Sequence, residues 1–334
     1  MLWLGGEGGM EAALVSRAGI PLESIPAAGV HGVGLRALPG NLLRLVRGVV
    51  TARRLIARFR PQAMLLTGGY VGVPAALAGW GVPKLVYVPD IEPGLALRLV
   101  ARVAQIVAVT TEESRRHHPR AKALIVTGYP TRPDLRPMEQ ARARRELGLD
   151  PAGRVLLVYG GSLGARSINE VVWSVLAELL DLAQIIHLTG DLDWPKVAGV
   201  RASLDAARAG RYHPYPYLHD EMARALSSAN LSISRAGAST LGELPLFGLP
   251  AVLVPYPHAW RYQKVNADYL VQRGAAVMVE DARLAVELLP TVRALLTDPE
   301  RLAAMSSAAR RQAVPDAAAR IAAEIERLAG GARD

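Results

Sequence analysis

Short apolar segments alternate with longer amphipathic segments along the whole chain, and this order restricts the fold more than any other feature. It is typical of parallel strands joined by helices that cover both faces of a sheet. In the first half the expected strands are Leu2–Leu4, Ser24–Ala27, Ala63–Leu66, Leu85–Val88, Ile106–Thr110 and Ala123–Val126. In the second half they are Val155–Tyr159, Ile185–Leu188, Tyr212–Tyr217, Leu231–Ser234, Ala251–Pro255 and Ala276–Val279. We therefore predict an α/β protein.

The two sets of strands are separated by a proline-bracketed linker, Thr131–Pro137. A chain of 334 residues is long enough for two domains that each bury a core of their own. We expect an N-terminal domain over residues 1–137, a second domain over residues 138–315 and a final helix within residues 316–334. Two doubly wound, Rossmann-like domains facing each other across a cleft are the simplest architecture.

The net charge of +9 is distributed unevenly. Residues 1–134 hold 16 Lys and Arg against 8 Asp and Glu, whereas the remainder holds 23 against 22. A basic first half indicates an anionic partner, and an anionic membrane surface or a lipid pyrophosphate fits it better than nucleic acid. No helix-turn-helix, zinc or RNP-type signature supports nucleic-acid binding. The absence of cysteine excludes disulfides and thiolate metal sites and is typical of a cytosolic protein.

A nucleotide-binding pattern follows the apolar run Leu231–Ser234. Small residues form the next turn, and a helix is expected from about Thr240 to Phe247, so its free N–H groups can bind a phosphate. The residues expected at this anion site are Gly237, Ala238, Ser239 and Thr240. Glu243 lies about one turn further on, where its carboxylate can accept both hydroxyls of a ribose. The alternative is a capping box, in which Thr240 and Glu243 only satisfy the start of the helix.

Two more polar features are expected at the same edge of the second sheet. Gln263 and Asn266 share one helix face at positions i and i+3 and can hydrogen-bond a neutral sugar. The loop Gly160–Ala165 follows a buried strand and places Ser162 and Gly164 near the start of a helix, which suits a diphosphate. Because Ser162 stands where the dinucleotide fingerprint has its second glycine, this loop differs from that motif.

Three segments resemble the peptidoglycan N-acetylglucosaminyltransferase (MurG) family, which belongs to glycosyltransferase family 28 and has the GT-B fold. They are GGSLGA at Gly160, SRAGA-T--E at Ser234 and QKVNA at Gln263. The resemblance covers nearly the whole chain and is strongest from about residue 154 to 280. It implies transfer of N-acetylglucosamine from UDP-N-acetylglucosamine to a lipid-linked muramyl peptide, with inversion, by a peripheral protein on the cytoplasmic face of the membrane.

The resemblance also implies roles for residues outside these segments. Arg132, in a GYPTR run similar to the family's GNPVR, is expected at the diphosphate, and Leu218 is expected to close over the uracil. Gly68, Gly69 and Tyr70, similar to the family's GGYVS run, are expected to bind the pyrophosphate or sugar of the acceptor. The final helix is expected to pack back on the first domain.

Two departures from the family concern the first domain. The chain has Tyr87, Val88, Pro89 and Asp90 where the family has His-Glu-Gln-Asn, which leaves Asp90 as the best-placed carboxylate for a general base. The chain also opens at what matches the family's second strand. We therefore expect the first domain to lack its usual central first strand, with two open strand edges as the result of a truncated reading of the gene.

The expected helix from Asn41 to Phe59 has two faces. Its predicted buried stripe is Leu42, Leu45, Val46, Val49, Ala52 and Ile56. A second line mixes apolar and cationic residues, namely Leu43, Arg47, Val50, Arg54 and Arg58. Apolar side chains between arginines are suited to an anionic lipid surface, and the alternative is an ordinary solvated face.

No metal or cofactor is expected. Asp191-Leu192-Asp193 imitates the DxD metal clamp of other glycosyltransferases, but it is interpreted as the cap of the following helix. Two rival functions stay open: a UDP-sugar 2-epimerase on the same fold, and a non-catalytic nucleotide-sugar-binding homologue that lacks the His-Glu pair.

Overall fold

The computed structural model describes all residues except 9–10, 28–37, 162–163 and 332–334. It contains two compact units, one formed by Met1–Thr127 with Ala318–Asp334 and the other by Gly128–Ala317. The division after Thr127 precedes the expected boundary at residue 137, because the predicted linker is packed against the second unit. Every predicted strand is present, with ends shifted by a few residues, and all the strand pairs are parallel.

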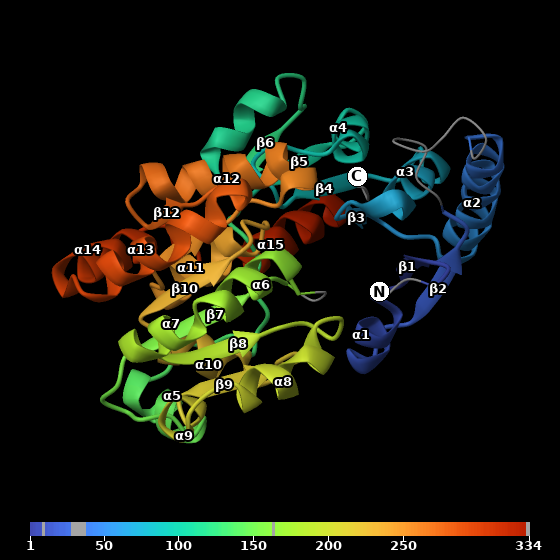
Figure 1. The fold of residues 1–334 in the computed structure, drawn as a ribbon. Helices are drawn as coiled ribbons and strands as arrows, with labels where there is room; N and C mark the ends of the chain where they lie inside the picture. The colour runs from blue at the N-terminus through green and yellow to red at the C-terminus, as the bar shows by residue number, and fades with distance from the viewer. Residues whose placement is uncertain (9–10, 28–37, 162–163, 332–334) are drawn as a thin grey trace. The chain divides into compact units, whose positions relative to one another are not determined.

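In the first unit, a four-stranded sheet has its strands in sequence order (Figure 1). These strands are β3 (Met64–Leu66), β4 (Lys84–Val88), β5 (Ile106–Val109) and β6 (Leu124–Val126). The helices of this unit are α1 (Glu11–Arg17), α2 (Leu38–Phe59), α3 (Gly69–Ala78), α4 (Leu95–Ala101), the 3₁₀ helix η1 (Glu112–His117) and α15 (Ala317–Gly330). Residues of α2, α3 and α4 bury one face of the sheet, and Ile321, Ile325 and Leu328 of α15 pack on the other.

The remaining strands of this unit, β1 (Trp3–Gly6) and β2 (Leu22–Ile25), form a separate two-stranded sheet. Leu4 of β1 nevertheless packs into the same apolar cluster as Met64 and Leu66 of β3. Within the described residues, β1 and β3 each have one edge that pairs with no strand.

The buried stripe of α2 differs from the predicted one. Leu42 and Val46 are exposed, whereas Leu45, Val49, Ala52 and Ile56 are at least partly buried. Gly48 explains the difference, because a Cβ there would lie 2.2 Å from the Pro26 carbonyl oxygen. The helix therefore turns its glycine toward the chain that follows β2, and Leu42 and Val46 join the exposed face.

The second unit has a six-stranded sheet in the order β12-β11-β10-β7-β8-β9. The strands are β7 (Val155–Tyr159), β8 (Gln184–Leu188), β9 (Tyr212–Tyr215), β10 (Leu231–Ser234), β11 (Ala251–Leu253) and β12 (Ala276–Met278). The chain runs outward from β7 in one direction and from β10 in the other. The strand order therefore reverses between β7 and β10, and ligands of such sheets bind beyond the carboxyl ends of strands at this switch point.

Helices cover both faces of this sheet. They are α5 (Gln140–Glu146), α6 (Arg166–Ser174), α7 (Leu176–Leu182), α8 (Val197–Ala202), α9 (Ala206–Ala209), α10 (Met222–Ser228), α11 (Thr240–Phe247), α12 (Trp260–Gln272), α13 (Leu284–Leu296) and α14 (Pro299–Arg310). Short 3₁₀ turns are η2 (Trp194–Lys196), η3 (Pro257–Ala259) and η4 (Asp281–Arg283). One large core packs α6, α7 and α13 against Leu156, Val158, Leu231 and Ile233 of the central strands.

A buried polar network runs through this core. His187 on β8 is fully buried and lies 3.0 Å from the hydroxyl of Tyr212 through Nδ1 and 3.0 Å from Asn169 Oδ1 through Nε2. Because an amide oxygen only accepts, Nε2 carries a proton, and burial lowers the pKa of the ring to about 3 and so keeps it neutral. The Asn169 amide donates to the Thr189 carbonyl oxygen at 2.8 Å and to Asp193 at 3.0 Å. The network therefore holds the turn after β8 in place.

No helix in the described part of the chain combines the length and the apolar character needed to cross a bilayer.

The His187 network makes a testable prediction about pH and stability. Burial lowers the pKa of His187 to about 3, whereas the unfolded chain takes up a proton at the ordinary value of about 6.5. The stability that neutral His187 contributes is therefore present above pH 6.5 and lost as the pH falls. The stability advantage of the wild type over His187→Gln should shrink by about 2 kcal/mol between pH 7 and pH 5.

Denaturant unfolding at the two pH values measures this difference. His258→Gln, which changes an exposed histidine, serves as the control and should show no such pH dependence relative to the wild type. A constant difference between wild type and His187→Gln would contradict the prediction.

Candidate active site

The loop after β7 approaches the turn after β8 very closely. Gly164 has φ of 77°, and a Cβ there would lie 2.2 Å from the carbonyl oxygen of Thr189. Gly161 also has a positive φ, of 94°. The glycines of this loop are thus required by backbone conformation and close packing. Gly164 lies one residue before Ala165, the N-cap of α6, as predicted for a phosphate loop, while Ser162 lies outside the described residues.

The turn after β10 exposes backbone donors at the other side of the switch point. Nothing in the described part of the chain accepts a hydrogen bond from the N–H groups of Gly237, Ala238 or Ser239. The Thr240 hydroxyl is buried and donates to the Gly237 carbonyl oxygen at 2.7 Å. Thr240 therefore closes the turn with its side chain, and the three preceding N–H groups are available to an anion.

Glu243 stands one turn into α11, and its carboxyl group makes no hydrogen bond or ion pair with any described residue. The capping box is absent, because the Thr240 hydroxyl is used by Gly237 and no side chain caps the helix. Burial raises the pKa of Glu243 to about 7, and the Arg132 guanidinium opposes this shift. A half-buried carboxyl group without a hydrogen-bond partner is unusual unless a ligand supplies the partner.

Arg132 and Leu218 lie on segments that meet near α11. The Arg132 guanidinium donates to the carbonyl oxygen of His219 at 3.1 Å and pairs with Asp134 at 3.2 Å. Leu218 itself is buried. The ring of Tyr129 packs so closely on Gly242 that a Cβ there would lie 2.7 Å from it. The segment that leads into the predicted linker therefore packs against the start of α11, and Arg132 of the linker itself binds the neighbouring His219.

The two residues predicted to bind a sugar differ in their surroundings. The Gln263 side-chain oxygen accepts from the Tyr256 N–H at 2.8 Å, and its NH₂ group has no hydrogen-bond partner among the described residues. Asn266 is fully buried and donates to the Ala236 carbonyl oxygen at 3.2 Å. The geometry thus gives Asn266 the task of holding α12 against the anion-binding turn.

Sequence reasoning missed Arg235, which follows β10 directly. Its guanidinium forms an ion pair with Asp281, donates to the Ser167 hydroxyl at 2.7 Å and lies 5.2 Å from the ring centre of Tyr256. Arg235 therefore joins the starts of α6 and η4 to the end of β10. A charged residue at the end of an otherwise apolar strand was the available signal.

The acidic pair after β8 is divided between solvent and interior. Asp191 is exposed, whereas Asp193 is buried and bound by Asn169 and by Lys196 at 2.9 Å. Asp193 is the first residue before η2, but its side chain does not cap that helix as predicted. The Asp193 carboxylate binds side chains instead of the helix N–H groups, because it is the last member of the buried His187 network. Among the described residues, no three His, Asp or Glu side chains are grouped as metal ligands are.

The residues predicted to meet the acceptor share one edge of the first unit. Gly68 and Gly69 follow β3 with φ of 108° and 73°, and Tyr70 is 63% exposed. Asp90 follows β4, the neighbour of β3, so both loops lie at the carboxyl ends of paired parallel strands. Tyr87, which replaces the family's histidine, points inward and shares a 2.9 Å hydrogen bond with Thr110.

Comparison with known proteins agrees with this arrangement. The glycosyltransferase family 28 N-terminal domain matches residues 1–109, and the family 28 C-terminal domain matches residues 155–321. A UDP-N-acetylglucosamine–N-acetylmuramyl-(pentapeptide) pyrophosphoryl-undecaprenol N-acetylglucosamine transferase from Roseiflexus sp. is 43% identical over 98% of this chain and 83% of the relative. The protein of the same name from Desulforudis audaxviator is 40% identical over 99% of this chain and 90% of the relative.

Among solved structures, Acinetobacter baumannii MurG superposes with a TM-score of 0.74 and 27% identity, over 97% of this chain and 90% of that one. A UDP-GlcNAc 2-epimerase from Neisseria meningitidis superposes with a TM-score of 0.65 over 94% of this chain and 88% of that one. Its 14% identity limits that likeness to the fold. The predicted fold class, α/β with two Rossmann-like domains, is confirmed, and the chain belongs to glycosyltransferase family 28.

Proposed function

We propose that this protein transfers N-acetylglucosamine from UDP-N-acetylglucosamine to a lipid-linked muramyl-peptide acceptor, inverting the anomeric centre. One observation carries the proposal: the carboxyl group of Glu243 lies one helical turn beyond the N–H groups of residues 237–239, and none of these groups has a hydrogen-bond partner in the described part of the chain. That spacing suits the ribose and diphosphate of a nucleotide sugar. The names of the relatives supply the sugar and the acceptor.

The donor half of the reaction follows from charge. Departure of UDP develops negative charge on the diphosphate, and fixed N–H donors stabilise such charge without reorganising. The N–H groups of residues 237–239, the loop that contains Ser162 and Gly164, and the Arg132 guanidinium are the groups we assign to it. Glu243 would bind the ribose hydroxyls, Gln263 would donate to the sugar, and Leu218 would cover the base.

The acceptor half uses the first unit. Gly68, Gly69 and Tyr70 would bind the pyrophosphate or sugar of the acceptor, since two residues with positive φ expose the backbone there. Asp90 would take the proton from the acceptor hydroxyl as it attacks C1 of the sugar. Its position at the end of the neighbouring strand supports this assignment.

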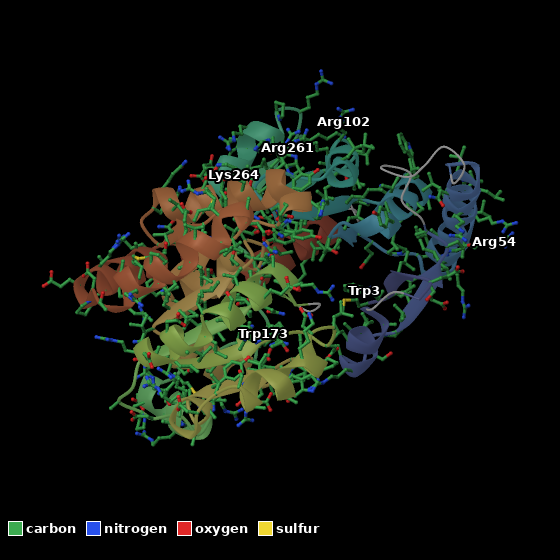
Figure 2. The ribbon with its side chains drawn as sticks, in the orientation of Figure 1. Trp3, Arg54, Arg102, Trp173, Arg261 and Lys264 are labelled. Carbon is green, nitrogen blue, oxygen red and sulfur yellow. The ribbon has the colours of Figure 1, made fainter. Side chains whose placement is uncertain are left out.

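We further propose that α2 binds an anionic membrane, which would place the protein peripherally on the cytoplasmic face. Leu43 and Val50 are 52% and 46% exposed, and Arg47 and Arg54 are exposed between and beside them. Arg54 extends from the face of α2 turned away from α3 (Figure 2). The neighbouring helices α3 and α4 add exposed apolar residues that sequence reasoning missed, namely Leu77, Leu95 and Leu99, and Trp80 follows α3 at 75% exposure.

Two assays separate this proposal from its rivals. UDP release from UDP-N-acetylglucosamine should require the lipid-linked acceptor and should leave the sugar attached to it. A 2-epimerase would act on UDP-N-acetylglucosamine with no acceptor present. A non-catalytic binding homologue would bind UDP and release none. Either of these last two results would contradict the transferase proposal.

The ribose assignment predicts the effect of Glu243→Ala. Loss of the carboxylate should weaken UDP binding by about 1–3 kcal/mol, because two ribose hydroxyls lose their acceptor. Titration calorimetry measures the affinity, and Glu300→Ala, an exposed change in the first turn of α14, is the matched control. Unchanged UDP affinity in Glu243→Ala would show that the ribose binds elsewhere.

The membrane assignment predicts that four changes on α2 together release the protein from lipid. The variant carries Leu43→Ser, Arg47→Gln, Val50→Ser and Arg54→Gln, and it should sediment far less with anionic liposomes than the wild type. Added salt should weaken the wild-type interaction, since exposed charges are screened.

The control for this experiment is Val286→Ser with Arg301→Gln, two exposed changes in the second unit. It should sediment like the wild type. If the α2 variant also sediments like the wild type, α2 is not the membrane-binding element.

A further inference from the structure

Three polar side chains lie together at the start of α11. The Tyr159 and Ser234 hydroxyls are buried and have no hydrogen-bond partner among the described residues except each other, and the Glu243 carboxyl group is the third. Tyr159 ends β7 and Ser234 ends β10, and the two are direct neighbours in the strand register. Both therefore lie at the switch point itself.

The alternation of side chains explains why these groups share one face of the sheet. Val158 and Ile233 point into the core formed with α6, α7 and α13, so Tyr159 and Ser234 point to the opposite face. The crossovers from β7 and from β10 run in opposite directions, and right-handed connections place α6 on one face and α11 on the other. Glu243 on α11 lies close enough for its charge to raise the pKa of Tyr159 further than burial alone.

A buried hydroxyl without a partner is destabilising, because it gave up hydrogen bonds to water on folding. A phenylalanine at position 159 would fill the same space without burying a hydroxyl. The two hydroxyls therefore lower the stability of the empty protein, and new hydrogen bonds in the ligand-bound protein can remove this effect. Near neutral pH the empty site also holds Glu243 partly protonated, since its pKa is raised to about 7 by burial.

We propose that Tyr159 is a positioning residue that holds Glu243 in its ionised form when the nucleotide is bound. On binding, Glu243 loses its proton to solvent and accepts the two ribose hydroxyls. The Tyr159 hydroxyl donates to the same carboxylate, and the Ser234 hydroxyl donates to the Tyr159 oxygen. Arg132 is the other charged group that acts on Glu243, and it favours the same ionised form. This inference rests on the proposed function, because it takes the ligand to be a UDP-sugar.

Proton release follows from this arrangement. Below pH 7 the empty protein carries the Glu243 proton and the complex does not, so UDP binding should release about one proton at pH 6 and almost none at pH 8. UDP affinity should accordingly rise about tenfold for each pH unit below about 6 and level off above about 7.

Calorimetric titration with UDP, in buffers of different ionisation enthalpy, tests both points. Tyr159→Phe should bind UDP about five- to tenfold more weakly at pH 8. In a Glu243→Gln background the same change should have no further effect, since no carboxylate remains to be held. The melting temperature of Tyr159→Phe without UDP should equal or exceed that of the wild type, because the Tyr159 O–H donates to no described residue.

Tyr269→Phe is the matched control, since its hydroxyl is bonded to Gln312 at 3.2 Å away from this cluster. It should bind UDP like the wild type at both pH values. Wild-type affinity in Tyr159→Phe, or an equal loss with and without Glu243, would overturn this inference and leave the transferase proposal standing. Failure of the wild type to bind UDP at any pH would instead overturn the transferase proposal.

Discussion

The pairing of β7 with β10 is the constraint on which the donor site depends. Residues 156–159 lie in register with residues 231–234, so the two loops that follow begin side by side. Their helices depart to opposite faces of the sheet, and sheets of this kind bind ligands in the crevice between two such loops. Glu243 is placed beside this position by α11, and Arg132 and Leu218 by the segments that pack near it. Without this pairing the two loops would not begin side by side.

The crevice is supported from below by polar groups of two different kinds. The His187 network is fully bonded and fixes the turn against which Gly164 packs, so it contributes stability and position together. The Tyr159, Ser234 and Glu243 side chains have no hydrogen-bond partner among the described residues outside their own group, and they lie next to the turn after β10. Fully satisfied polar networks rigidify a core, whereas unsatisfied ones are costly and occur at functional sites. By this criterion, the bonded His187 cluster is a structural element of the sheet, and the Tyr159 cluster is the candidate for a functional one.

The first unit combines an open sheet with exposed apolar helices. The β1 and β3 edges pair with nothing in the described residues, and the helices on one face present leucine, valine and tryptophan side chains to solvent. An unpaired edge and an apolar patch both favour contact with another surface. The positive charge of this half of the chain is the reason for proposing an anionic lipid surface as the partner of these side chains.

The sequence by itself determined the fold class and the strands, because the alternation of apolar runs and amphipathic helices is a local property that tertiary contacts did not override. It also selected Gly164, Gly237 and Glu243 as candidates for the nucleotide site, since small residues at a strand end and a carboxylate one turn later form a local pattern. Only the tertiary structure decided whether Glu243 was a cap or a free carboxyl group, because that depends on where the Thr240 hydroxyl points. Gln263 and Asn266 are predicted on the same face of one helix. Only the packing of α12 shows that Asn266 is buried, while Gln263 keeps an NH₂ group that binds no described residue. Nothing in the sequence was a reason to select Tyr159, because it ends an apolar strand as a core residue would. The role proposed for its hydroxyl depends on Ser234 of the neighbouring strand and on Glu243 of α11, which lie far from Tyr159 along the chain.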